Sequence, residues 1–449
     1  MSIESSTVVA VPRSEVFAWF SRPGAFTRLS PPWQPVSLIE EAESLANGRA
    51  VLGLPGGLRW IAQHDADAYD PPFRFADHIV RDGPASAPLA TALSWHHVHE
   101  FVDVDPTHTR VVDRVQTWLP AAALRPMFAY RYRQLADDLA AHERAAAHGF
   151  TAATVAVTGS SGLIGSALTA FLSAGGHQVI RLVRGEPRRP DQRRWNPDQP
   201  DDGLLAGVDA VIHLAGESIA GRFTEDHKRR IRDSRVDPTR RLAELSARSG
   251  VSAFICASAI GFYGSDGGDD LLSEDAPQGT GFLADVVGAW EDAAATAATA
   301  ATRVVSVRTG IVQSPRGGTL RLMRPLFAAG LGGRIGDGHQ WLSWIGIDDL
   351  VDIYHRTLWD SDLRGPVNAV APEPVRNAEF ARILGRTMRR PTMLPVPAFG
   401  PELLLGRDGA HELALASQRV TPQRLRRAGH AFRQPELAAA LGHVLGRAH

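Results

Sequence analysis

The chain of 449 residues is 44% hydrophobic and 22% charged, and its formal net charge is −1. This balance is ordinary for a globular protein of two or three domains, and it predicts neither a nucleic-acid partner nor attraction to an anionic membrane. A single cysteine, Cys256, excludes an intrachain disulfide and a multi-cysteine metal site, and no apolar run is long enough to span a bilayer. Without a charged-then-apolar leader after Met1, we expect a cytoplasmic protein.

Residues 1–148 carry the pattern of an α+β domain. An apolar run at 7–11 is followed by a helical pattern at 14–20, by turn-rich and alternating segments, and by a closing helix at about 123–147. His97 and His99 alternate with their neighbours, which places both on one face of a strand. They could line a pocket or bind a metal, but no carboxylate is obviously paired with them. We therefore favour polar positions on a half-exposed strand and predict no metal site.

Two motifs in this segment carry a resemblance to a known superfamily. They are Pro12-Arg13-Ser14-Glu15-Val16-Phe17 and Trp95-x-His97-x-His99-x-Phe101. With these motifs the segment resembles the START-like, polyketide-cyclase-type (SRPBCC) superfamily. The resemblance implies a helix-grip fold, in which a curved sheet holds a long helix around an apolar cavity, and it implies a hydrophobic ligand in that cavity.

The next segment begins with a glycine motif between a strand and a helix. An apolar run at 155–157 precedes the motif and an amphipathic run at 166–174 follows it, which is the setting of a dinucleotide site. One glycine permits the tight turn, one lets the backbone approach a pyrophosphate, and one lets helix pack on strand. The helix N-terminus offers free N–H groups to the phosphates. The predicted cofactor-binding residues are Gly159, Ser160, Ser161, Gly162, Leu163, Ile164 and Gly165.

Strand and helix patterns then alternate through residues 152–370. Apolar runs at 179–184, 210–216, 254–258 and 304–308 read as strands, and residues 224–248 read as a long polar helix. This order predicts an α/β fold with a Rossmann-type, doubly wound parallel sheet. Residues 371–449 show helical patterns punctuated by prolines and glycines, and they could form the ligand-side lobe of the same protein or a packing appendage.

The predicted second strand ends in Arg184, 19 residues after Gly165. An acidic residue near this position binds the ribose 2′-hydroxyl of NAD, whereas an arginine accommodates the 2′-phosphate of NADP. A guanidinium suits phosphate geometry, although Arg184 could also be an ordinary surface residue of a chain with one lysine, Lys228, among its 48 basic residues. We therefore predict NADP in preference to NAD.

An ordered set of motifs now carries a second, more specific resemblance. The motifs are TGSSGLIG at 158–165, HLAGESIAG at 213–221, Lys228-x-x-Ile231-x-x-Ser234-Arg235-Val236, SAIGFYG at 258–264, RTGIV at 308–312, and GHQWLSWI at 338–345. The chain resembles the atypical extended short-chain dehydrogenase/reductases, in the epimerase-like family labelled SulA-type nucleotide-sugar epimerases. Residues 374–380 and 418–422 resemble the small C-terminal domain of that family.

The resemblance adds further cofactor contacts. Leu214, Ala215 and Gly216 follow a strand where relatives contact the ribose and phosphates, and Arg235 stands where ordinary members have an asparagine. Arg235 could reach a cofactor phosphate or pair with Asp233 or Asp237. Val312 could lie near the nicotinamide or pack in the core.

The resemblance is less informative about catalysis. Ordinary members use a Tyr-x-x-x-Lys unit, in which the lysine lowers the phenol pKa from about 10 so that the phenol serves as acid or base. Here Leu283 occupies the tyrosine position and Val287 the lysine position. Ser258 and Tyr263 are the candidate catalytic residues in their place, although Tyr263 would need another group to lower its pKa.

Three hypotheses about function follow. Ser258 and Tyr263 could form a substitute catalytic pair that acts with NADP on a small-molecule substrate. Alternatively, the chain could bind NADP(H) without turnover, as a sensor or scaffold for the ligand of the N-terminal domain. In the third hypothesis, the N-terminal domain presents a hydrophobic substrate to the reductase. The sequence identifies neither the substrate nor the oligomeric state.

Overall fold

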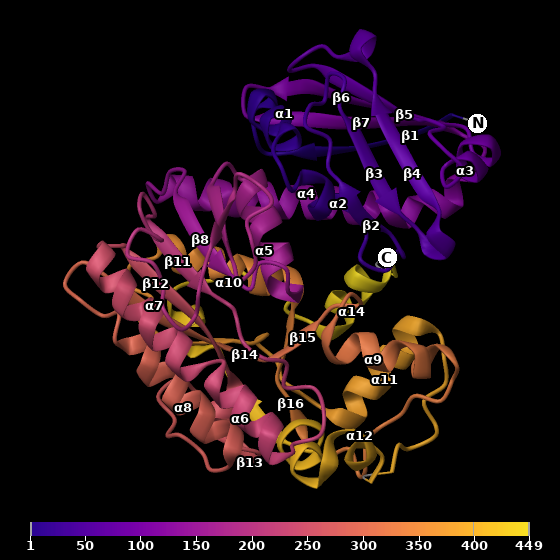
Figure 1. Cartoon of the computed structure of the whole chain (residues 1–449). Helices are drawn as coiled ribbons and strands as arrows, with labels where there is room; N and C mark the ends of the chain where they lie inside the picture. Colours follow the sequence, from indigo (N-terminus) through magenta and orange to yellow (C-terminus); the bar gives the residue numbers. More distant parts are fainter. Residues whose placement is uncertain (1, 398, 448–449) are drawn as a thin grey trace. The chain divides into compact units, whose positions relative to one another are not determined.

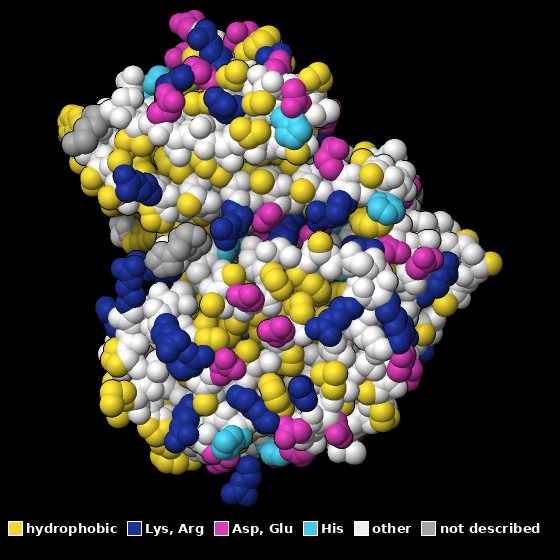
Figure 2. Space-filling model, turned by 180° about the vertical axis from the view of Figure 1, so that it is seen from behind, with side chains coloured by type: hydrophobic (Ala, Val, Ile, Leu, Met, Phe, Trp, Pro, Cys, Tyr) yellow, Lys and Arg dark blue, Asp and Glu magenta, His cyan; other side chains and the backbone are white. Residues whose placement is uncertain are grey.

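The computed structural model describes residues 2–397 and 399–447. They form two compact units, the first consisting mainly of residues 2–152 and the second mainly of residues 178–445 (Figure 1). Within the described ranges, no helix is both long enough and apolar enough to cross a membrane. Basic and acidic side chains intermingle over the face of the molecule shown in Figure 2, so neither sign of charge dominates that face.

The first unit contains a seven-stranded sheet in the order β1-β7-β6-β5-β4-β3-β2, and every neighbouring pair is antiparallel. Its strands are β1 (Ser2–Val9), β2 (Ser37–Glu40), β3 (Arg49–Gly53), β4 (Arg59–His64), β5 (Arg74–Ile79), β6 (Trp95–Asp105) and β7 (His108–Thr117). Its helices and 3-10 turns are α1 (Arg13–Ser21), α2 (Ala25–Leu29), η1 (Pro55–Gly57), η2 (Ala66–Ala68), α3 (Ala87–Ala92) and α4 (Ala121–Ala147). The expected α+β order of this segment is confirmed.

The long helix α4 buries one apolar stripe. Leu124, Phe128, Leu135 and Leu139 recur at helical spacing and are all buried. Each such side chain contributes about 1.5–3 kcal/mol on full burial. Phe128 packs with Val115 of β7, so α4 covers this face of the sheet.

The histidines of β6 lie on the covered face. His97 is 5% exposed and His99 is 4% exposed, so the expectation of half-exposed polar positions is wrong. The expectation that no carboxylate partners them is also wrong, because Asp113 of β7 lies directly opposite His99. Strand periodicity shows that the two histidines share a face but not whether that face is buried. Helix α4, more than twenty residues further along the chain, covers it.

The second unit contains a seven-stranded sheet in the order β10-β9-β8-β11-β12-β14-β18, and all its neighbouring pairs are parallel. Its strands are β8 (Thr154–Thr158), β9 (Gln178–Val183), β10 (Gln192–Arg194), β11 (Ala210–His213), β12 (Ala253–Ala259), β14 (Arg303–Thr309) and β18 (Gly365–Ala369). The order reverses between β8 and β11, which is the switch point where Rossmann folds bind dinucleotides. The predicted Rossmann-type α/β sheet is confirmed.

Helices and short strand pairs surround this sheet. The helices and turns are α5 (Leu163–Ala174), α6 (Glu225–Asp233), α7 (Val236–Ser249), η3 (Ile260–Tyr263), α8 (Phe282–Ala295), α9 (Gly318–Ala328), α10 (Ile347–Trp359), α11 (Asn377–Met388), α12 (Phe399–Gly409), η4 (Ala410–Ala414), α13 (Gln423–Arg427) and α14 (Leu437–Leu445). The short strands are β13 (Asp266–Leu272), β15 (Ile311–Gln313), β16 (Trp341–Leu342), β17 (Trp344–Gly346), β19 (Val375–Arg376) and β20 (Ser417–Val420). They pair as β13 with β20, β15 with β17, and β16 with β19.

Two apolar clusters hold the second unit together. The first joins β8, β9, β11 and β12 to α7 and α8, and Phe254, Leu242 and Trp290 are among its buried members. The second joins α9, α11 and α14 through Phe327, Leu384 and related residues. Between them, the carboxyl ends of the parallel strands support the candidate site.

Candidate cofactor and active site

The glycine turn lies between β8 and α5, as expected. Gly159 has a φ of +64°, and a side chain there would approach the Leu214 backbone to 2.9 Å. A Cβ at Gly165 would lie 2.2 Å from the carbonyl oxygen of Gly159. Ser161 and Gly162 are exposed at the turn, and the unpaired first-turn N–H groups of α5 begin at Leu163. The turn thus offers backbone donors at a helix N-terminus, which suits an anion.

A buried threonine fixes the neighbouring strand end. The backbone N–H groups of Leu214 and Ala215 donate to the Thr158 hydroxyl at 3.0 and 3.1 Å. The His213 ring lies between two threonines, with Nδ1 2.8 Å from the Thr158 hydroxyl and Nε2 3.0 Å from the Thr239 hydroxyl. Burial lowers the pKa of His213 to about 3, with a smaller contribution from Arg235. Residues 214–216 are therefore held beside the glycine turn.

The arginines near this turn differ in what they contact. Arg184 follows β9 directly, is exposed, and makes no hydrogen bond or ion pair with another described residue. Arg181 is occupied instead, since it bonds to Asp191 and to Thr169. The nearest acidic residue after the strand, Glu186, pairs with Arg194 at 2.8 Å. Arg184, which the sequence predicts to face the 2′-phosphate of NADP, thus carries a guanidinium with no partner among the described residues.

Arg235 and Val312 border the same region. The Arg235 guanidinium lies against Gly216, where an added Cβ would approach it to 3.1 Å, and it donates to the Ile231 carbonyl. Among the described residues it forms no ion pair with Asp233 or Asp237, which disfavours that alternative. Val312, Leu163 and Ile164 are partly buried and pack against the second apolar cluster.

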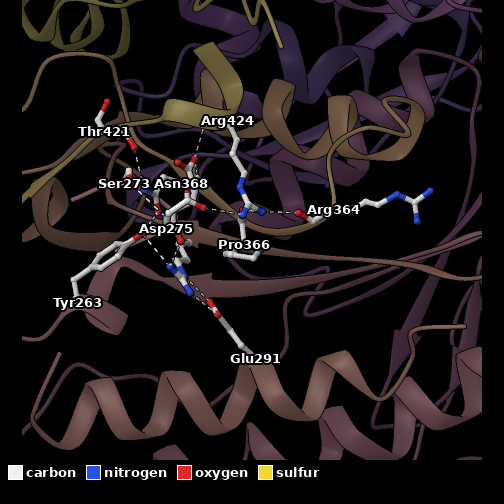
Figure 3. A network of polar contacts seen from close by, with 11 residues as sticks. Tyr263, Ser273, Asp275, Glu291, Arg364, Pro366, Asn368, Thr421 and Arg424 are labelled. Atoms are coloured by element: carbon white, nitrogen blue, oxygen red, sulfur yellow. Dashed lines mark hydrogen bonds and ion pairs between the residues drawn. The ribbon is translucent and has the colours of Figure 1, made fainter. Parts of the chain in front are cut away.

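Ser258 and Tyr263 are joined by a buried ion pair. Arg308 of β14 donates two hydrogen bonds of 2.8 Å to the Glu291 carboxylate of α8. Ser258 donates to the same carboxylate at 2.5 Å, and Arg308 donates to the Tyr263 hydroxyl at 3.0 Å. Tyr263 in turn donates to the Asn368 side chain at 2.7 Å (Figure 3). We call Ser258, Tyr263, Glu291, Arg308 and Asn368 the Arg308 network.

The network restricts the chemistry available to Tyr263. Burial raises the pKa of Tyr263, although the Arg308 guanidinium opposes the shift. The phenol is 5% exposed, and its hydroxyl both donates and accepts inside the protein. A substitute catalytic tyrosine needs a lowered pKa, and this environment acts in the opposite direction.

The place of the usual Tyr-x-x-x-Lys unit is apolar. Leu283 and Val287 are 9% and 4% exposed on the inner face of α8, where a Cβ on Gly261 of η3 would contact both. Glu412 caps this helix, accepting from the N–H groups of Phe282 and Leu283 at 2.9 and 2.7 Å. Lys228 pairs with Asp408 at 2.7 Å and does not replace the missing lysine.

A cavity of about 470 Å³ lies in the second unit, next to the segment that carries Tyr263. Ser417, in its wall, donates its N–H to the carbonyl of Ser265 at 2.7 Å. The polar side chains of the wall are Asp269, Asp337, His339, Gln340, Arg376 and Ser417. Sequence reasoning did not identify this set, because it gathers residues from β13, β19, β20 and the 335–340 loop. A small polar molecule fits such a lining.

Two tryptophans of the 338–345 motif have different surroundings. Trp344 is 1% exposed and donates to the Glu373 carbonyl at 3.0 Å, so it anchors the loop. Trp341 is half-buried beside the cavity, with the Arg376 and Arg419 guanidinium groups 4.0 and 4.8 Å from its ring centroid. Trp341 therefore borders the space where a ligand would lie.

Comparison with known proteins agrees with this geometry. The model of the NAD dependent epimerase/dehydratase family matches residues 155–368, and that of a domain of unknown function, DUF1731, matches residues 396–444. An epimerase family protein of Mycobacterium bovis is 44% identical over 298 residues, which are 66% of this chain and 98% of that protein.

Two solved structures extend the comparison. The nucleoside-diphosphate sugar epimerase from Corynebacterium glutamicum has a TM-score of 0.86 and 44% identity, over 99% of this chain and 90% of that chain. The human epimerase family protein SDR39U1 (isoform 2), crystallised with NADPH, has a TM-score of 0.60 and 34% identity, over 65% of this chain and 99% of that chain. With the glycine turn and the strand order described above, these matches show that the chain belongs to the NAD dependent epimerase/dehydratase family.

Proposed function

We propose that the chain binds NADP(H) at the turn formed by Gly159–Gly165, with the 2′-phosphate against Arg184. The observation that carries the proposal is the uncommitted Arg184 guanidinium at the end of β9, next to an acidic residue, Glu186, that is already paired. The NADPH in the human relative supports the same cofactor. Arg235, beside Gly216, is the second candidate for a phosphate contact.

The reaction we propose is an oxidoreductase or epimerase-like step on a small molecule bound in the cavity near Ser417. The name of the Corynebacterium glutamicum relative supports this reaction class. Ser258 and Tyr263 remain the proposed hydrogen-bonding and acid groups. Because burial raises the pKa of Tyr263, the phenol stays protonated and is a weaker acid than a free tyrosine, so we expect it to act on the substrate as a hydrogen-bond donor rather than as a base.

One observation favours a second candidate, a protein that binds NADP(H) without turnover. Leu283 and Val287 leave the usual catalytic position apolar, and the Arg308 network already uses the Tyr263 hydroxyl. Substrate-dependent oxidation of NADPH separates the two candidates. If turnover occurs and a Tyr263→Phe variant retains it, Tyr263 is not the acid.

For the first unit we propose a START-like helix-grip domain, residues 1–148, that holds a hydrophobic ligand. Its support is the antiparallel sheet together with the buried stripe of α4. We further propose that residues 152–370 form the nucleotide-binding domain, that residues 371–449 complete the substrate-side lobe, and that the protein acts in the cytoplasm.

Cofactor choice is tested by titrating the full chain with NADPH and with NADH, following nicotinamide fluorescence. Charge-assisted hydrogen bonds contribute about 1.5–3 kcal/mol, so Arg184→Ala should weaken NADPH binding about tenfold or more and leave NADH binding unchanged. Arg188→Ala, at an exposed arginine four residues further on, is the matched control and should bind both as the parent does. If Arg184→Ala weakens the binding of NADPH and of NADH equally, Arg184 does not contact the 2′-phosphate. Failure of the parent chain to bind either cofactor would end the proposal.

A further inference from the structure

Three strands of the first unit bring two histidines and two aspartates together beneath α4. In the register of the sheet, Asp77 of β5 lies opposite His97 of β6, and His99 of β6 lies opposite Asp113 of β7. His97, His99 and Asp113 are buried, and Asp77 is half-buried at the border of the group. The Phe128 ring of α4 lies 6.0 Å from the His97 ring and covers it. We call these four residues the His97–Asp113 cluster.

Asp113 lies against both imidazoles but is hydrogen-bonded to one. Its Oδ1 bonds to Nε2 of His97 at 2.8 Å and lies 2.7 Å from Nδ1 of His99 without the alignment of a hydrogen bond. The ring centroids are 3.9 Å apart, and the His99 ring stacks on Phe75. A carboxylate that accepts a ring N–H fixes the tautomer and leaves the other ring nitrogen as a lone pair, as behind histidines that bind metals.

The Asp77 carboxylate faces the other ring nitrogen of His97. With its proton toward Asp113, a neutral His97 presents the Nδ1 lone pair to the Asp77 carboxylate, and the facing atoms are 3.8 Å apart. Asp77, His97 and His99 each place one ligand atom within 4.8 Å of the other two. Two acceptors that face each other at this distance gain nothing from each other, whereas a cation between them bonds to both.

The charge of the cluster also favours a cation. Two carboxylates lie in or beside the core, and the ion-pair partners that the described structure gives Asp113 are the two imidazoles. Arg131 is close enough to His99 to act on its charge and offsets part of the negative charge.

We propose that Asp77, His97 and His99 bind a divalent transition-metal ion, with Asp113 as the positioning carboxylate for His97. Imidazole and carboxylate ligands suit Zn²⁺ and Fe²⁺. Three protein ligands leave at least one coordination position for water or for a ligand of the N-terminal domain. The competing arrangement has a proton on His97 in place of the metal, which would make the cluster a structural ion pair.

The test uses the full chain stripped with a chelator and titrated with Co²⁺, whose visible absorption reports its ligands, and with Zn²⁺ by calorimetry. We expect one tight equivalent despite the 17 histidines of the chain. His97→Gln should abolish tight binding, and Asp77→Asn should weaken it about tenfold or more. Asp113→Asn should weaken it about 10–100-fold without changing the stoichiometry, as expected for an outer carboxylate.

His96→Gln is the matched control. His96 is the neighbouring residue on the same strand, faces the opposite side of the sheet, and pairs in register with His78. It should bind the metal as the parent does. Asp77 is at the border of the cluster, so Asp77→Asn tests the proposal even if His97→Gln does not fold, and circular dichroism checks each variant. Absence of a tight equivalent, or unchanged affinity in Asp77→Asn and His97→Gln, would overturn the proposal; so would loss of binding in His96→Gln.

Discussion

The Arg308 network and the His97–Asp113 cluster are both buried groups of titratable side chains, but they differ in charge balance. In the network, the Glu291 carboxylate receives two hydrogen bonds from a guanidinium, and the Tyr263 hydroxyl is bonded on both sides. In the cluster, two carboxylates face two imidazoles. A network with balanced charge fixes geometry and leaves little room for chemistry, whereas an unbalanced one has the capacity to bind a charged ligand.

Removing Arg308 should convert the balanced network into an unbalanced one. Arg308→Met leaves the Glu291 carboxylate, whose side chain is 14% exposed, without its cation, so we expect a loss of about 3 kcal/mol of unfolding free energy, the lower end of the cost of breaking a buried pair. Urea denaturation followed by circular dichroism measures the loss. The double variant Arg308→Met/Glu291→Gln should recover part of it, because no buried charge then remains. A loss below about 1 kcal/mol in the single variant would show that the ion pair does not hold this part of the fold.

The sequence predicts the local features of the second unit better than the contacts of the Arg308 network. The glycine turn and the alternation of strands and helices are local patterns, so the cofactor end and the sheet could be predicted from them. The pairing of Arg308 with Glu291 could not, because it depends on how α8 packs against β14. That Leu283 and Val287 stand in place of the usual catalytic unit stays a prediction from the sequence.

The cluster was missed although a signal for it exists. His97 and His99 alternate on one strand, and Val111, Asp113 and Val115 alternate on the next. The turn between Asp105 and His108 closes the hairpin. This signal was incomplete, because extending the register from the Asp105–His108 pair alone would place Arg114 opposite His99, and the one-residue irregularity between Asp103 and Asp105 brings Asp113 there instead. The burial of the group could not be predicted in this way, since it depends on α4.

His213 shows a third way to keep a titratable side chain in a core, and it should make the second unit sensitive to acid. The ring bonds to two threonine hydroxyls, and its pKa falls from 6.5 to about 3 in the folded protein. The unfolded chain therefore takes up the proton first below pH 6.5, so this contribution is complete above pH 6.5 and is lost as the pH falls toward 3.

The free energy of unfolding that His213 contributes should fall by up to about 1.4 kcal/mol per pH unit, or up to about 2 kcal/mol between pH 6.5 and 5. Urea denaturation at several pH values measures it. His213→Gln should be less stable at pH 7, because hydrogen bonds in the core are lost, but its stability should change less between pH 6.5 and 5. The same slope in the variant and the parent would assign the acid sensitivity to other groups.

Asp77→Asn has the smallest expected effect on the free energy of unfolding. The sign of this effect distinguishes a metal site from a structural ion pair in the His97–Asp113 cluster. If Asp77 faces a lone pair of His97, Asp77→Asn should stabilise the metal-free protein by about 1 kcal/mol, because a charge that repels its neighbour is removed and functional sites commonly cost stability. If His97 instead carries a proton, the same substitution breaks an ion pair and lowers stability.

Saturating Zn²⁺ should reverse the order of stability of parent and variant in the first case, since a metal at 100 times its Kd adds about 2.7 kcal/mol to the parent and less to the variant. Thermal unfolding of both proteins, with chelator and with Zn²⁺, measures the two differences. Lower stability of the variant under both conditions, by equal amounts, would make the His97–Asp113 cluster a balanced network like that of Arg308.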